Sequence, residues 1–362
     1  MKKVCFVLAY PIYHDFWTIE QWLEIKNQNR WIAGILARFG YDVEFWIVDH
    51  KPGVYTSTLE GFPDYTVRAF EATKKGKQTK FDYSDTMVEY AFNHPPDALL
   101  IKGVDGGIGD RLIRSFCNPT HTPYVMVIGG AYHHPNNAKA KAILHESNYQ
   151  KEKLIRPWPY FWRKPVQEEK LFQYHKSIDI NRFAPLPVKE KKYDAITVSR
   201  IVKRNKRFDE IGELSNHARV AIVGDGPYRE ELQKRYPNAI WLGKVMNDNI
   251  PELLNQSKTY IHPSVKEWII TRDFYPRTIG EALACGVPCI GFEDAIQDDI
   301  IPSACGMLIK RSDVVPACTA LFKKPEILAQ MSEAARTHAR QHLHINSAEE
   351  PLRKALTFAG LL

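Results

Sequence analysis

The feature that most constrains this chain is a repeated alternation of short apolar runs with stretches of helical periodicity. The run "KVCFVLAY", residues 3–10, shows no two-residue period, which is typical of a strand buried on both faces. Residues 30–48 carry a helical pattern followed by a second apolar run, and further runs lie at 94–103 and 122–130. Residues 51–85 have the composition of a loop. The alternation predicts a parallel, doubly wound α/β sheet.

A second set of apolar runs begins near residue 190, after the proline- and lysine-rich stretch "RFAPLPVKEKK", which is typical of a domain boundary. These runs are "KKYDAITVSR", "RVAIVGDGP", "AIWLGKV", "TYIHPS" and "VPCIGF". We therefore expect two Rossmann-like domains facing each other across a cleft, one over 1–186 and one over 187–345, and a last helix over 346–362 that crosses back to the first domain. Ligands of such sheets bind at the carboxyl ends of the strands.

Composition excludes several classes of protein. Hydrophobic residues make up 44% of the chain and charged residues 25%, as in soluble globular proteins. No stretch approaches the ~20 apolar residues of a membrane span, and the first apolar run is too short for a signal peptide. Six cysteines without paired spacing favour a reducing compartment, so we expect a cytoplasmic protein. The net charge of +7 suits a phosphate-bearing ligand or an anionic membrane surface, which leaves peripheral contact with the inner face of a membrane open.

The stretch "RDFYPRTIGEALACGVPCIGF", residues 272–292, combines two carboxylates with the start of a helix. Good helix formers predict a short helix that begins near Pro276 and is stopped by the Gly-Val-Pro sequence. The free N–H groups at its start would bind a phosphate or diphosphate. Asp273 would lie in the loop above this anion, and Glu281 could reach a hydroxyl such as that of a ribose. The alternative is that Asp273 caps the helix and Glu281 completes the cap.

A basic stretch, "SRIVKRNKRFD", follows the first strand of the second domain. Arg200 ends that strand and Lys206 lies six residues later, so both cations could clamp a diphosphate leaving group. The alternative is a solvated basic loop. The stretch "VGDGPYREEL", residues 223–232, matches neither glycine-rich nucleotide fingerprint and indicates a tight turn that opens a helix.

Other chemistries have weaker support. Cys285 and Cys289 have no partner at zinc spacing, and the chain has no Asp-x-Asp pair, so we expect no metal site. His133 and His134 could act as acid/base groups or belong to a loop without a role. Residues 151–165 mix basic and aromatic side chains, which suits a membrane interface, a sugar platform, a nucleic acid or packing between the domains.

Taken together, these motifs resemble the GT-B-fold retaining glycosyltransferases of glycosyltransferase family four, also called group 1 glycosyl transferases. "DFYPRTIGEALACGVPCIG" resembles the motif in which an acid and a glutamate are separated by seven residues. The other matching pieces are "LARFGYDVEFW", "KSIDINRFAP", "SRIVKRNKRFD", "VGDGP", "WLGKV", "HPS" and "LAQMSEAARTHARQH". The resemblance covers most of residues 30–345 and is tightest from 176 to 292.

The resemblance implies a role for each candidate residue. Arg200 and Lys206 would bind the donor diphosphate and stabilise it as it leaves, Glu281 would bind the ribose, and Asp273 would contact the transferred sugar. The base and the diphosphate would be bordered by Gly243, Lys244, Val245, Phe274, Tyr275, Pro276, Arg277 and Thr278. His133 is the nearest candidate for a cleft histidine of the family. Asp273 departs from the family, whose first acid is usually glutamate.

The resemblance also implies an N-terminal acceptor domain, a C-terminal donor domain and a hexosyltransferase activity. A UDP- or GDP-linked sugar would pass to an acceptor hydroxyl with retention, without a metal, in the synthesis of a polysaccharide, glycolipid or other glycan. The expected partners are the nucleotide-sugar and an acceptor glycan, lipid-linked sugar or small molecule, with no nucleic acid.

Two alternatives stay open. A sugar-nucleotide epimerase of the same fold would need acids and bases in the first domain, and its candidates are Asp105, Asp110, His133 and His134. A non-catalytic polyanion-binding protein would use residues 74–80 and 151–165.

Overall fold

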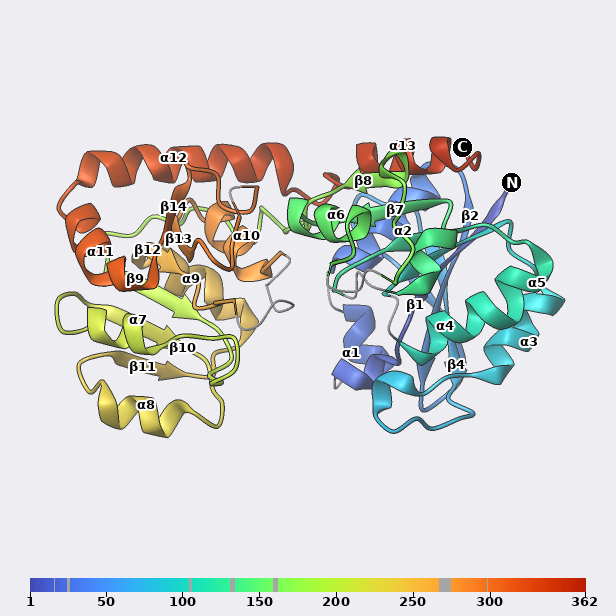
Figure 1. The fold of residues 1–362 in the computed structure, drawn as a ribbon, viewed down its shortest axis with the longest axis horizontal. Helices are drawn as coiled ribbons and strands as arrows, with labels where there is room; N and C mark the ends of the chain where they lie inside the picture. The colour runs from blue at the N-terminus through green and yellow to red at the C-terminus, as the bar shows by residue number, and fades with distance from the viewer. Residues whose placement is uncertain are drawn as a thin grey trace. The chain divides into compact units, whose positions relative to one another are not determined.

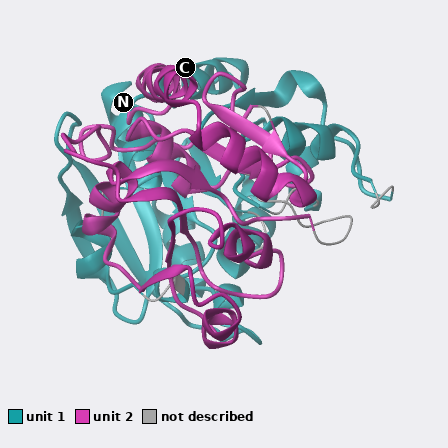
Figure 2. Cartoon of the chain, turned by 90° about the vertical axis from the view of Figure 1, so that its left-hand side faces the viewer, with its two compact units in different colours: residues 1–175, 346–362 teal, residues 176–345 magenta. Residues whose placement is uncertain are grey.

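The computed structural model describes residues 1–15, 17–24, 27–103, 106–130, 134–158, 162–266, 275–297 and 299–362. The chain divides into two compact units, unit 1 with residues 1–175 and 346–362 and unit 2 with residues 176–345 (Figure 2). Each unit has a mainly parallel sheet, so the prediction of two Rossmann-like α/β domains is confirmed. Unit 2 begins before the boundary expected between 186 and 187, because Ile178 and Phe183 are buried in its core.

Unit 1 is built on an eight-stranded sheet with the order β3-β4-β2-β1-β5-β6-β7-β8 (Figure 1). Its strands are β1 (Lys3–Leu8), β2 (Asp42–Asp49), β3 (Gly53–Ser57), β4 (Tyr65–Glu71), β5 (Ala98–Lys102), β6 (Tyr124–Val127), β7 (Ala142–His145) and β8 (Leu171–Gln173). The central strands are mostly apolar because both faces are covered, and in the register Phe6 lies opposite Phe45 and Leu100.

The strands β3 and β4 occupy part of the segment that was expected to be loop, and that prediction is wrong there. β4 pairs in parallel with β2, and β3 pairs antiparallel with β4. Exposed or half-buried residues alternate with more deeply buried ones along most of both strands. They therefore lack the continuous apolar run that revealed the central strands.

Helices surround the sheet of unit 1, and its last residues return to it. The helices are α1 (Ile19–Glu24), α2 (Gln28–Arg38), α3 (Asp85–Asn93), α4 (Gly107–Leu112), α5 (Asn118–Thr120), α6 (Asn148–Ile155) and α13 (Glu349–Phe358), with the shorter turns η1 (Ile12–Asp15), η2 (Thr79–Phe81), η3 (Ile113–Cys117), η4 (Pro135–Lys139) and η5 (Glu168–Lys170). The Leu361 carbonyl accepts hydrogen bonds from Lys2 Nζ at 2.7 Å and Tyr41 Oη at 3.0 Å. These bonds and an Arg38–Glu349 ion pair of 3.1 Å hold the C-terminal segment on unit 1.

Unit 2 has a six-stranded parallel sheet with the order β11-β10-β9-β12-β13-β14 (Figure 1). Its strands are β9 (Tyr193–Val198), β10 (Val220–Val223), β11 (Ile240–Gly243), β12 (Ser257–Ile261), β13 (Cys289–Phe292) and β14 (Gly306–Ile309). Its helices are α7 (Asp209–Leu214), α8 (Arg229–Arg235), α9 (Ile250–Asn255), α10 (Arg277–Ala284), α11 (Val314–Phe322) and α12 (Pro325–His342), with the turns η6 (Asn247–Asn249) and η7 (Arg311–Asp313).

The helix α10 begins and ends where its sequence predicts. Pro276 is its N-cap, and Gly286 beyond its end has φ +67°, a conformation that glycine adopts without strain. The Gly286 N–H donates to the Leu283 carbonyl at 3.0 Å, and the Val287 N–H donates to the Ala282 carbonyl at 2.9 Å. This pair of bonds is the Schellman arrangement that ends many helices.

Two further observations concern the cysteines and the helices. All six cysteines are buried and free of disulfide bonds. Across the described part of the chain, every helix is too short or too polar to cross a bilayer.

Candidate functional site

The predicted donor residues gather at one edge of the unit 2 sheet. All six strands run in parallel, so their carboxyl ends share an edge, where ligands of such sheets bind. Arg200 follows β9, Gly226 follows β10, Lys244 follows β11 and Ser264 follows β12. The start of α10 belongs to the same edge, since this helix leads from the end of β12 to the start of β13.

The glycine loop after β10 supports the segment that carries Arg200. Gly224 and Gly226 have φ +139° and +155°, which favour glycine. A Cβ atom on Gly224 would lie 1.9 Å from the Ser199 carbonyl oxygen, so only glycine allows this close approach. The Ile201 N–H donates to the Asp225 carbonyl at 2.9 Å. The turn opens α8, as predicted, and also fixes the backbone beside Arg200.

Arg200 and Lys206 differ in their surroundings. The Arg200 side chain is exposed, and within the described ranges its guanidinium makes no hydrogen bond or ion pair. Lys206 is half-buried, and its Nζ donates a hydrogen bond to Ser264 Oγ. Arg200 is therefore available for an anionic ligand, whereas Lys206 is held in place by the neighbouring loop.

Ser264 belongs to a chain of buried hydrogen bonds that the sequence interpretation missed. Its Oγ lies 2.7 Å from His262 Nε2, and His262 Nδ1 lies 2.9 Å from Tyr260 Oη. The three side chains are at most 3% exposed. The sequence assigns no role to the side chains of the motif "HPS", whose histidine and serine connect Lys206 to the core.

At the start of α10, Glu281 forms an ion pair within its own helix. Its Oε1 lies 3.1 Å from Arg277 Nε, and the carboxylate side chain is 8% exposed. Burial raises the pKa of Glu281 above its ordinary value, although the charges of Arg277 and Arg182 oppose that shift. The N-cap Pro276 has no N–H group, so Glu281 does not complete a cap, and that alternative is wrong for this residue.

The loops next to α10 and β11 complete this edge. Tyr275 is buried, and its carbonyl accepts a hydrogen bond of 2.8 Å from Lys176 Nζ, a residue that the sequence interpretation had not singled out. Gly243 has φ +72°, and its carbonyl accepts the Gly224 N–H at 2.8 Å. Lys244 is exposed and Val245 is half-buried.

Some predicted residues lie outside the described ranges or elsewhere in the fold. Asp273 and Phe274 fall in the undescribed stretch 267–274, and Asp105 and His133 are also outside the description. The other candidates of the epimerase alternative are in unit 1. There Asp110 Oδ1 lies 3.9 Å from His134 Nε2, and Asp110 also pairs with Arg114.

Two cavities of unit 2 lie away from the predicted residues. One of about 450 Å³ is lined by Glu293, Asp294 and Lys310 among others, and one of about 380 Å³ by Tyr236 and Val315 among others. Neither lining includes Arg200, Lys206 or Glu281. The candidate site is therefore defined by its position in the sheet and by its charges.

Part of unit 2 matches a known family of proteins. Residues 194–323 match the model of the family described as glycosyl transferases group 1. A sulfoquinovosyl transferase of Arabidopsis thaliana is 28% identical over 110 residues, which cover 29% of this chain and 20% of that relative.

Solved structures resemble the whole chain. HepE of Anabaena, solved in complex with UDP, has a TM-score of 0.69 at 13% identity, covering 99% of this chain and all of that one. Sucrose-phosphate synthase of Thermosynechococcus elongatus has a TM-score of 0.69 at 14% identity, covering 100% of this chain and 98% of that one. The chain therefore has the GT-B fold of two Rossmann-like α/β domains, and residues 194–323 within it match the family of glycosyl transferases group 1.

Proposed function

We propose that this protein transfers a sugar from a nucleoside-diphosphate sugar to an acceptor hydroxyl, with retention of configuration at the anomeric carbon. The observation that carries the proposal is the position of Arg200, Lys206 and the start of α10 at one edge of the unit 2 sheet, inside the stretch that matches the family. Two cations and the free N–H groups of a helix start suit a diphosphate.

Each residue has a part in the proposed reaction. Arg200 and Lys206 stabilise the negative charge that develops on the diphosphate as the glycosidic bond breaks. Asp273 contacts the transferred sugar as positive charge builds on it, and Glu281 holds the ribose. The acceptor hydroxyl attacks the anomeric carbon on the face from which the diphosphate leaves. A phosphate oxygen of the leaving group takes the proton of this hydroxyl. Because two side-chain cations serve the diphosphate, the proposed reaction needs no metal.

The donor is proposed to be a UDP-sugar, with a GDP-sugar as the second choice. HepE was solved with UDP and with UDP-glucose, which supports uridine as the base. The acceptor, a glycan, a lipid-linked sugar or a small molecule, would bind unit 1, where His133 would act on it.

The proposed place of action is the cytoplasm, with peripheral contact to a membrane surface. Trp158 and Trp162, in the basic segment 151–165, are 60% and 64% exposed, and this supports the membrane contact. The product would be a polysaccharide, glycolipid or other glycan.

Nucleotide binding tests the donor site first. UDP at a hundredfold excess over its dissociation constant should stabilise the protein by about 2.7 kcal/mol, measured as a rise in melting temperature, with GDP and ADP compared. Arg200→Met should lose most of this shift. Arg204→Met, an exposed cation of the same basic stretch, is the matched control and should keep it. Equal shifts in the two variants would favour the solvated-loop alternative.

A donor assay then separates transfer from epimerisation. With UDP-sugars and a panel of acceptors, proton NMR of the product should show the anomeric configuration of the donor. Conversion of UDP-N-acetylglucosamine to another UDP-sugar without any acceptor would contradict the proposal and support the epimerase.

A further inference from the structure

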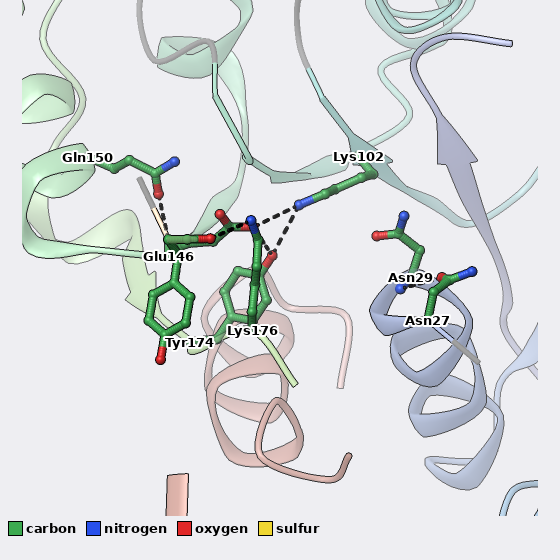
Figure 3. Close-up of polar contacts among 8 residues, drawn as sticks. Asn27, Asn29, Lys102, Glu146, Gln150, Tyr174 and Lys176 are labelled. Atoms are coloured by element: carbon green, nitrogen blue, oxygen red, sulfur yellow. Dashed lines mark hydrogen bonds and ion pairs between the residues drawn. The ribbon is translucent and has the colours of Figure 1, made fainter. Parts of the chain in front are cut away.

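Three polar side chains meet at the carboxyl edge of the unit 1 sheet. Lys102 ends β5, Glu146 directly follows β7 and Tyr174 directly follows β8. Lys102 Nζ lies 3.1 Å from Glu146 Oε1 and 3.3 Å from Tyr174 Oη, and Tyr174 Oη lies 3.2 Å from the same Glu146 oxygen. Figure 3 shows the Lys102 side chain extending toward Glu146 and Tyr174. We call these three residues the lysine–glutamate cluster.

The lysine–glutamate cluster is held in one geometry. The side chain of Glu146 is 0% exposed and that of Lys102 is 12% exposed, so a small part of the lysine still reaches the surface. The Glu146 N–H donates to Gln150 Oε1 at 2.6 Å, which fixes the glutamate backbone. A Cβ atom on residue 129 would lie 3.2 Å from Lys102 Nζ, and glycine at this position leaves room for the lysine.

The buried lysine–glutamate cluster is not a favourable arrangement if its role is only to stabilise the fold. An ion pair taken out of water loses hydration that its mutual attraction only partly returns, and well-packed apolar residues often serve stability equally well. The rest of β5, from Ala98 to Ile101, is apolar and fully buried. A purely structural strand end could therefore have continued with an apolar residue.

The position within the sheet points to a ligand. β2 lies on one side of β1 and β5 on the other, so the order of the strands reverses between β1 and β5. In open parallel sheets, ligands bind outside the carboxyl ends of the strands at such a point. Lys102 is the last residue of β5 and lies beside Leu8 at the end of β1.

The chemistry of the lysine–glutamate cluster indicates a neutral, hydroxyl-rich ligand. Lys102 is paired with Glu146, so an anionic ligand at Lys102 would meet the glutamate charge as well as the lysine. Burial and the Glu146 charge raise the pKa of Tyr174 well above its ordinary value, so its hydroxyl stays neutral, donates to Glu146 and accepts from Lys102. Sugar hydroxyls also donate and accept.

We propose that the lysine–glutamate cluster binds hydroxyl groups of an uncharged sugar on unit 1, and that this sugar is the acceptor. The identification as acceptor rests on the proposed transferase function. In this arrangement Lys102 donates to a sugar hydroxyl, while Glu146 and Tyr174 position the lysine.

The test uses the full chain saturated with UDP and a panel of methyl α-glucoside, methyl α-galactoside, methyl α-mannoside and glucose 6-phosphate. Binding is followed by saturation-transfer NMR and titration. At least one methyl glycoside should bind, and glucose 6-phosphate should bind no more tightly than methyl α-glucoside. The double variant Lys102→Met/Glu146→Met removes both charges of the ion pair together. It should weaken glycoside binding at least tenfold.

A matched control separates binding from folding. Lys141→Met makes the same chemical change at an exposed lysine just before β7, at the opposite edge of the same sheet, and should leave glycoside binding unchanged. All variants should keep the UDP-induced rise in melting temperature, which reports on unit 2. Glycoside binding that persists in the double variant, tighter binding of the phosphorylated sugar, or no glycoside binding by a wild-type protein that binds UDP would each overturn the inference. Loss of UDP binding in the wild type would instead count against the proposed function.

Discussion

The ammonium of Lys206 donates a hydrogen bond to the hydroxyl of Ser264, 58 positions later in the chain. Backbone hydrogen bonds join their two loops on either side, because the Arg207 N–H donates to the Pro263 carbonyl at 2.8 Å and the Val265 N–H donates to the Asn205 carbonyl at 3.2 Å. Lys206 therefore does not explore solvent like an ordinary surface lysine. Its position depends on the loop that follows β12.

This dependence predicts that Ser264→Ala weakens donor binding. Hydrogen bonds to charged groups contribute about 1.5–3 kcal/mol, so the affinity for UDP should fall roughly tenfold or more. Isothermal titration with UDP measures the effect, and Ser312→Ala is a control outside this hydrogen-bond chain. An unchanged affinity in a folded Ser264→Ala protein would show that the position of Lys206 does not matter for the donor.

Asp273→Asn should mainly lower turnover. The residue is proposed to contact the sugar as positive charge develops, so its interaction should strengthen toward the transition state. A loss of roughly 10²–10³-fold in kcat is the scale for one such group. Steady-state kinetics with a UDP-sugar and acceptor measure it, and the melting temperature confirms folding. Wild-type turnover in the folded variant would refute the catalytic role of Asp273.

Glu281→Gln should behave differently, because the ribose is far from the bond that breaks. Its contact should be similar in the ground and transition states, so KM for the donor should rise about tenfold while kcat changes little. The ion pair with Arg277 offers another role, in which the carboxylate only holds that arginine. A double-mutant cycle with Arg277→Met distinguishes the two: if Glu281 only holds Arg277, Glu281→Gln should cause no further rise in the donor KM in the Arg277→Met background, whereas a direct ribose contact should raise KM in both backgrounds.

The close approach of Gly224 to Ser199 predicts a large cost for a methyl group. Gly224→Ala meets both a positive φ and a carbonyl oxygen 1.9 Å from the new Cβ, so we expect a loss of about 2–4 kcal/mol in the free energy of unfolding. Gly40→Ala is the matched control, because its φ is +87° and nothing lies within 4 Å of the new Cβ. Its loss should be about 1–2 kcal/mol. Equal losses in urea unfolding would mean that the loop after β10 can move away from Arg200.

Local sequence signals predicted the main strands and the α10 boundaries, because an apolar run, a proline and a glycine act within a few residues. They also placed Arg200 at the end of the strand that is β9, which stops two residues earlier, and predicted the glycine turn that opens α8. They missed β3 and β4, which lack a continuous buried apolar run. They could not reveal the bond between Lys206 and Ser264 or the pairing of Lys102 with Glu146, because each depends on which distant strand ends become neighbours. Lys102 ends β5 and Glu146 follows β7, and β6 lies between these two strands in the sheet.

The residue before Glu146 gives a prediction about pH. His145 is 1% exposed, and its Nδ1–H donates to the Ser147 carbonyl at 3.1 Å. Burial lowers the pKa of His145 to about 4, and the charges of Lys151 and His175 act in the same direction. In the unfolded chain its pKa is near 6.5. Between pH 6.5 and 4 the unfolded chain therefore binds a proton at His145 that the folded protein does not bind. The free energy of unfolding therefore falls as the pH falls through this range.

The size of this loss can be measured against a variant that does not titrate. At pH 5 the His145 contribution should cost about 2 kcal/mol relative to pH 7. His145→Asn keeps an N–H donor near the Nδ1 position but cannot take up a proton, so its free energy of unfolding should fall less over this range by about that amount. His217→Asn, at an exposed position, should keep the wild-type dependence. Urea unfolding at pH 7, 6 and 5 gives the change in the free energy of unfolding with pH for the wild type and both variants. If His145→Asn shows the same change as the wild type, the folded protein protonates His145 as readily as the unfolded chain does.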